Sequence, residues 1–144
     1  MKSRSMFAAF GIVFVLSCLT LHATTCIAGK SFKVPQVCGI VADKQGAAIP
    51  NATIQLTPKG HSENAKEISS GEEGRFIFSN VADGQYELRV KVDGFWDAWQ
   101  PLAVSRSHEY RKCSHPIRVV MVPAGGCSYV ENAWKKSALS RAAY

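Results

Sequence analysis

The fold is decided by two stretches of sequence, GIVADKQGAAIPNATIQL at residues 39–56 and GEEGRFIFSNVADGQYELRVKVDG at residues 71–94. In both stretches apolar and polar residues alternate with a period of two, and glycines fall where short strands must turn. The clearest alternation spans residues 85–92, where the apolar positions are Tyr86, Leu88, Val90 and Val92. The pattern predicts β-strands that bury one face and expose the other.

The same signals continue along the chain. They predict strands at residues 36–43, 52–57, 66–69, 75–79, 85–92, 98–105 and 116–122. Residues 59–70 are expected to be a mobile polar connection, in which residues 66–69 form at most a short edge strand. Short strands at regular spacing, with turns between them and no helical period, predict an all-β sandwich of seven strands.

The N-terminus has the composition of a secretory signal peptide. Lys2 and Arg4 precede an apolar run at residues 6–16, and small residues follow at Ala23 and Ala28. Cleavage is expected after Ala28 or after Ala23. Two alternatives are a retained membrane anchor, for which the apolar run is short, and lipidation of Cys18 at the lipobox-like residues 15–18.

The expected organisation is therefore a cleaved signal peptide at 1–28, a domain at 29–128 and a basic tail at 129–144, which forms either a short helix or a frayed end. The protein is expected to be secreted or periplasmic, with no membrane span in the mature chain. The net charge of +6 includes Lys2 and Arg4, and the remaining charges of both signs are interleaved on the strands. This pattern argues against nucleic-acid binding, which favours a dense basic stripe.

The spacing of the strand and turn residues resembles the carboxypeptidase regulatory-like domain family. The resemblance rests on Gly39-x-Val41-x-Asp43-x-x-Gly46-x-x-Ile49-Pro50-x-Ala52-x-Ile54-x-Leu56, on Gly74-x-Phe76-x-Phe78-x-x-Val81-x-x-Gly84-x-Tyr86-x-Leu88-x-Val90, and on Gly94-Phe95. It covers about residues 36–123. It implies the prealbumin-like (transthyretin-like) Greek-key sandwich of seven strands.

The resemblance also implies a role and a disulfide. In this family the domain carries no catalytic residues and acts as a folding, spacing or binding module, so we expect a non-enzymatic stand-alone module at the cell envelope or outside the cell. The first and last strands of such sandwiches run parallel, which implies a disulfide between Cys38 and Cys113. Cys127 is then free, paired with Cys26 or paired with another chain.

Catalytic and metal sites have weak support in the sequence. His108, Cys113 and His115 could ligate a metal, but Arg111 and Lys112 beside them disfavour a cation, so we expect no metal and no cofactor. A hydrolase on the same fold, the transthyretin-related hydroxyisourate hydrolase, ends in Tyr-Arg-Gly-Ser, and this chain ends in Ser-Arg-Ala-Ala-Tyr. A small hydrolase remains an alternative, which would need His61, His108 and Glu109 to converge.

Aromatic residues supply the candidate binding site. Flat indole faces stack on sugar rings, so Trp96 and Trp99, with Asp97 and Tyr110, could form a carbohydrate platform. A competing interpretation is that Phe95 and one tryptophan complete the core. We expect that the two tryptophans are not both buried. The expected partner is a polysaccharide or an envelope protein.

Overall fold

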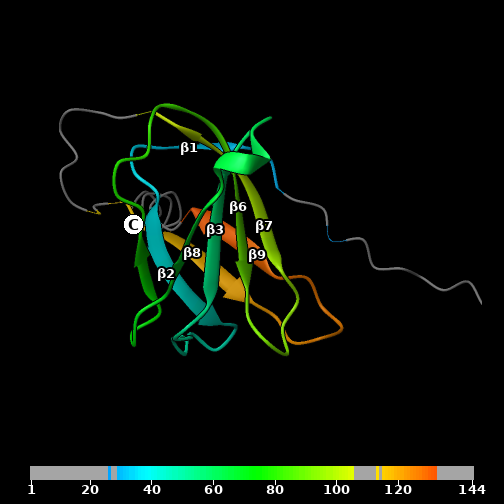
Figure 1. The fold of residues 1–144 in the computed structure, drawn as a ribbon. Helices are drawn as coiled ribbons and strands as arrows, with labels where there is room; N and C mark the ends of the chain where they lie inside the picture. The colour runs from blue at the N-terminus through cyan, green and yellow to red at the C-terminus, as the bar shows by residue number, and fades with distance from the viewer. Residues whose placement is uncertain (1–25, 27–28, 106–112, 114, 133–144) are drawn as a thin grey trace, which may run out of the picture.

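The computed structural model describes residue 26, residues 29–105, residue 113 and residues 115–132. This part of the chain is built of β-strands, with one turn of 3-10 helix, η1 (Ser62–Asn64), between two of them (Figure 1). The strands are β1 (Phe32–Val34), β2 (Cys38–Asp43), β3 (Thr53–Pro58), β4 (Lys66–Ser69), β5 (Arg75–Ile77), β6 (Gly84–Lys91), β7 (Ala98–Val104), β8 (Ile117–Met121) and β9 (Tyr129–Asn132).

The strands form two sheets that pack face to face, as Figure 1 shows. The first sheet has five strands in the order β1-β7-β6-β3-β4, and the second has four in the order β5-β2-β8-β9. β1 with β7 and β2 with β8 are parallel pairs, and the other pairs are antiparallel. The predicted all-β sandwich is confirmed, including the parallel pairing of the first predicted strand with the last.

The described residues contain nine strands, two more than the seven expected. The additional strands are β1 and β9. β1 has only three residues, too few to show an alternating pattern, and exists through its parallel pairing with residues 102–104 of β7. β9 pairs with β8 and packs only Val130 against the core. The sandwich therefore extends to Asn132, beyond the expected boundary at 128. Residues 129–132 of the expected tail at 129–144 form a strand and are neither helical nor frayed, because they pair with β8, and residues 133–144 lie outside the described part.

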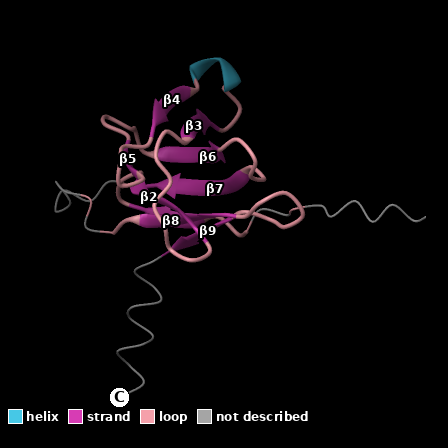
Figure 2. Ribbon diagram, turned by 90° about the horizontal axis from the view of Figure 1, so that it is seen from below, coloured by secondary structure: helices cyan, strands magenta, loops and turns pink. Residues whose placement is uncertain are grey.

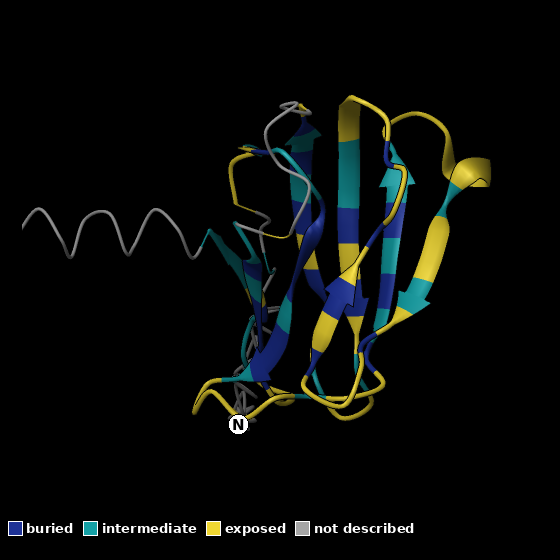
Figure 3. Cartoon of the chain, turned by 90° about the vertical axis from the view of Figure 1, so that its left-hand side faces the viewer, coloured by how far each residue is buried: buried dark blue, intermediate teal, exposed yellow. Residues whose placement is uncertain are grey.

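The core lies between the two sheets and is formed by the residues that alternation placed there. Leu88 and Val90 of β6 are 0% exposed, whereas Arg89 and Lys91 are exposed. Figure 3 shows the same alternation as buried and exposed bands along the strands. Burying each such side chain fully contributes about 1.5–3 kcal/mol, so a one-residue slip of β6 would lose several kcal/mol. The alternation thus fixes which residues of β6 reach the outer face of the first sheet.

Two glycines let the backbone pass where a side chain would collide. Gly39 lies in the parallel β2–β8 pair, and a Cβ at this position would overlap the carbonyl oxygen of Ile117. Gly74 has a φ of 68°, and a Cβ there would overlap the carbonyl oxygen of Val41. Steric crowding therefore explains why glycine occupies both positions, which belong to the spacing pattern quoted above for the family resemblance.

Two disulfide bonds link distant segments of the described chain. Cys38 is bonded to Cys113, which is the pairing that the family resemblance implied, over a sequence separation of 75 residues. Cys26 is bonded to Cys127 over a separation of 101 residues, which selects one of the three fates left open for Cys127. In the chain-entropy model, loops of this length make each bond worth about 4 kcal/mol.

Candidate carbohydrate-binding face

Trp99 stands on the outer face of the first sheet. It lies in β7 between Ala98 and Gln100, which are 0% and 3% exposed, while Trp99 itself is 39% exposed. Because successive side chains of a strand point to opposite faces, burial of both neighbours directs the indole away from the core. Gln100 is tolerated inside because its Nε2 donates to the carbonyl oxygens of Lys30 at 2.9 Å and Pro101 at 3.0 Å.

The strand register places three polar residues in line with Trp99. Trp99 is opposite Arg89, Arg89 is opposite Gln55, and Gln55 is opposite Glu67. Directly opposed residues share a face of the sheet, so these four residues form a cross-strand row over β7, β6, β3 and β4, whose order is visible in Figure 2. With strands about 4.8 Å apart, the row is about 14 Å long.

The polar groups of the cross-strand row are available to a ligand. Among the described residues, no hydrogen bond or ion pair engages the side chain of Arg89, Gln55 or Glu67. Arg89 and Glu67 are exposed and Gln55 is half-buried. Arginine only donates hydrogen bonds, an ionised glutamate only accepts them, and glutamine does both. The row therefore offers every kind of partner that a sugar hydroxyl can use.

Charges on the outer face of the first sheet and at its margin balance. The basic residues are Lys33, Arg89 and Lys91, with Lys59 at the margin, and the acidic residues are Glu67 and Glu87, with Asp93 and Asp97 at the margin. Further short polar side chains, Thr53, Thr57 and Ser69, flank the cross-strand row on the same face. The face is thus polar and close to neutral, which does not favour a strongly charged ligand.

Trp96 lies off the row, in the segment that leads into β7. Its backbone nitrogen donates to Val122 O at 3.0 Å, and its carbonyl oxygen accepts from Ser128 Oγ at 2.6 Å. Ser128 Oγ also accepts from Val122 N at 2.8 Å, so a buried hydroxyl ties this segment to the second sheet. The indole of Trp96 remains 47% exposed.

The structure excludes one of the two interpretations of the aromatic segment. Phe95 packs against the core, but both tryptophans are exposed, so the interpretation that a tryptophan completes the core is wrong. Asp97 is exposed immediately before β7, and Tyr110 lies outside the described residues. Arg89, Gln55 and Glu67 were not anticipated from the sequence. Alternation marks them as outward-facing, but only the register shows that they align with Trp99.

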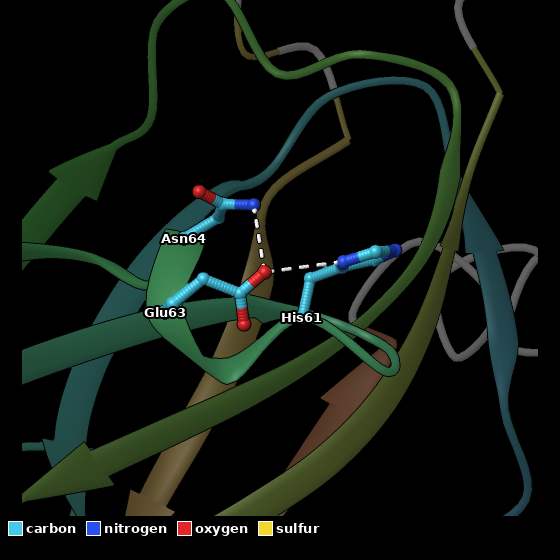
Figure 4. Close-up of polar contacts among 3 residues, drawn as sticks. All are labelled: His61, Glu63 and Asn64. Atoms are coloured by element: carbon cyan, nitrogen blue, oxygen red, sulfur yellow. Dashed lines mark hydrogen bonds and ion pairs between the residues drawn. The ribbon is translucent and has the colours of Figure 1, made fainter.

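The remaining sequence candidate, His61, makes local contacts at the surface. Its Nδ1 lies 3.2 Å from Glu63 Oε1, which also accepts from Asn64 Nδ2 at 3.3 Å (Figure 4). The side chains of His61 and Glu63 are 64% and 66% exposed. His108 and Glu109, the other members of the catalytic alternative, lie outside the described residues. In the described part of the chain, no group of three or more His, Cys, Asp or Glu side chains could hold a metal ion.

A groove of about 410 Å³ opens between the edge strands β4 and β5. Its apolar lining includes Ile40, Ile68, Phe76, Ile77 and Pro116. The arginine at this groove, Arg75, is already paired, because its Nε lies 2.8 Å from Glu73 Oε2. The described lining of this groove is therefore mainly apolar.

The fold and its outer face define a small disulfide-linked β-sandwich with an exposed aromatic residue at one end of a polar row. The chain belongs to the carboxypeptidase regulatory-like domain family, whose sequence profile matches residues 36–112, more than half of the 144 residues. The family predicted from the glycine and strand spacing is thereby confirmed.

Comparison with solved structures gives a remote similarity. The chain is similar to 3-chlorocatechol 1,2-dioxygenase from Rhodococcus opacus 1CP, with 13% sequence identity and a TM-score of 0.38. The similarity covers 72% of this chain and 63% of the dioxygenase, and at this level it carries no argument about activity. The comparison with curated proteins gave no match. Within residues 29–105 and 115–132, no helix is long and apolar enough to cross a membrane.

Proposed function

We propose that this protein is an exported, non-catalytic module that binds a neutral polysaccharide through the outer face of the first sheet. The observation that carries the proposal is the exposed indole of Trp99 at the end of the cross-strand row. Family membership supports a role as a module. In a sandwich of this kind most residues form the core and the turns, which leaves few residues for catalysis.

The chemistry of the face fits a sugar. An indole stacks on the apolar face of a pyranose ring, and neighbouring polar side chains then bind the hydroxyls at the ring edge. Arg89, opposite Trp99, supplies donors at this position, and Gln55 supplies both a donor and an acceptor. The balanced charge of the face favours a neutral glycan over a polyuronate or a sulfated chain.

Export is part of the proposal. Disulfides persist in oxidising compartments, and the Cys38–Cys113 and Cys26–Cys127 bonds support a location in the periplasm or outside the cell. The basic and apolar N-terminal residues support secretion by a signal peptide. A polysaccharide of the envelope or of the surroundings is the ligand class that such a location offers.

The proposal is tested by titrating the purified protein with soluble cello-, manno- and chito-oligosaccharides, following tryptophan fluorescence and backbone amide shifts. Binding is expected to shift amides of β6 and β7. Trp99→Ala should weaken binding about tenfold or more. Tyr129→Ala is the matched control, because Tyr129 is an aromatic residue of similar exposure, 43%, on the second sheet. Equal affinity in the Trp99 variant and wild type, or no binding to any of the three series, would refute the proposal.

A further inference from the structure

The cross-strand row is a linear feature rather than a pocket. It spans four strands and about 14 Å, which is longer than one sugar ring. Its chemical character changes along its length, from the aromatic Trp99 through the donor Arg89 and the amide Gln55 to the acceptor Glu67. A ligand that used the entire row would need several sugar units joined in an extended chain.

No described strand extends the row at either end. β1 pairs with β7 only from Leu102 to Val104, and upstream of β1 the carbonyl oxygen of Lys30 contacts the inward side chain of Gln100, next to Trp99. At the other end, Glu67 lies on β4, which is the edge strand of the first sheet. A polysaccharide could therefore continue past either end of the row.

A second path on the same face can be compared with this one. From Arg89 toward the start of β6, the outward residues are Glu87 and Gln85. Gln85 lies about 14 Å from Arg89 along the strand. The path across the strands starts at the indole and then meets free donors and acceptors in turn. The path along β7 itself meets Pro101 and Ala103, which offer no side-chain hydrogen bonds.

We infer that the cross-strand row binds an internal segment of an extended neutral polysaccharide that crosses the strands, with one sugar stacked on Trp99 and a sugar several units away hydrogen-bonded to Glu67. This inference rests on the proposed function and adds the direction of the chain, the need for several sugar units and the role of Glu67. Affinity then depends on ligand length, because a disaccharide on Trp99 does not reach Glu67.

The test measures calorimetric affinities of the full exported protein for cello-, manno- and chito-oligosaccharides from the disaccharide to the hexasaccharide. For the series that binds, wild-type affinity should increase from disaccharide to hexasaccharide. Glu67→Ala should weaken hexasaccharide binding about three- to tenfold, the effect of losing one or two hydrogen bonds, and leave disaccharide binding unchanged. Hexasaccharides reduced to the alditol should bind as tightly as unreduced ones.

Gln85→Ala is the matched control. Gln85 is an exposed polar residue on the same face, about 14 Å from Arg89 along β6, and does not belong to the row. Two results would overturn the inference while leaving carbohydrate binding intact. One is an equal wild-type affinity for the disaccharide and the hexasaccharide. The other is a weaker hexasaccharide affinity in the Gln85 variant together with an unchanged one in the Glu67 variant. Absence of binding to all three series would overturn the proposed function and the inference with it.

Discussion

Cys26 and Cys127 are joined by a disulfide, with their Cα atoms 5.4 Å apart and a sequence separation of 101 residues. The bond connects the chain upstream of the first strand to the loop between β8 and β9. Cys127 is also the neighbour of Ser128, whose hydroxyl donates a hydrogen bond to the carbonyl oxygen of Trp96.

This bond has a consequence for N-terminal processing. A mature chain that began at Gly29 would lack Cys26, so we predict signal-peptide cleavage after Ala23 rather than after Ala28. N-terminal sequencing and intact mass of the exported protein should show Thr24 as the first residue. A mature protein starting at Gly29, or a lipidated one starting at Cys18, would contradict the prediction.

The Cys38–Cys113 disulfide should contribute strongly to stability. Replacing both cysteines with alanine is expected to lower the free energy of unfolding by about 4 kcal/mol, because the unfolded chain regains the entropy of a long loop. Urea denaturation under non-reducing conditions measures the effect. A loss below about 1 kcal/mol would show that the loop closure does not stabilise the fold in the way the chain-entropy model requires.

Gly39→Ala should destabilise the sandwich. The new methyl group would meet the carbonyl oxygen and side chain of Ile117 in the neighbouring parallel strand, and overpacking of this kind costs about 1–3 kcal/mol. Gly71→Ala is the control, because a Cβ there would meet only Arg75 O, at an ordinary 3.8 Å. Thermal unfolding should separate the two variants, and equal melting temperatures would refute the steric explanation.

Ser128→Ala should also destabilise the protein, by about 1–3 kcal/mol, since it removes the partner of both Val122 N and Trp96 O in a buried site. Hydrogen exchange of the Val122 amide should accelerate. Ser69→Ala is the control, because Ser69 is exposed on the edge strand β4. An unchanged exchange rate at Val122 in the Ser128 variant would contradict the assigned hydrogen bond.

The sequence was sufficient for the sandwich because alternation in β6 and the glycine turns are local signals. Pairing is not local. That Arg89 lies opposite Trp99 follows from the exact length of the β6–β7 connection, and β1 exists only because residues 102–104 are beside it.

Trp99 shows a second limit of prediction from sequence. Hydropathy alone favours a buried tryptophan and an exposed glutamine, but Gln100 shares its face with Ala98, Leu102 and Val104, which are all buried. The two backbone carbonyls that satisfy Gln100 come from Lys30 and Pro101, and no spacing rule identifies the first of them. The alternation of buried positions along the whole of β7, and not the hydropathy of a single residue, determines that Gln100 rather than Trp99 faces the core.

The parallel pairing of β2 with β8 sets the order in which the protein can be assembled. β2 is made early during synthesis, yet one of its two neighbours, β8, begins at Ile117. Until that late segment emerges from the ribosome, one edge of β2 stays open and the second sheet is incomplete. The second sheet can therefore close only after residues 117–121 have been made, an order of events that is compatible with the export proposed above.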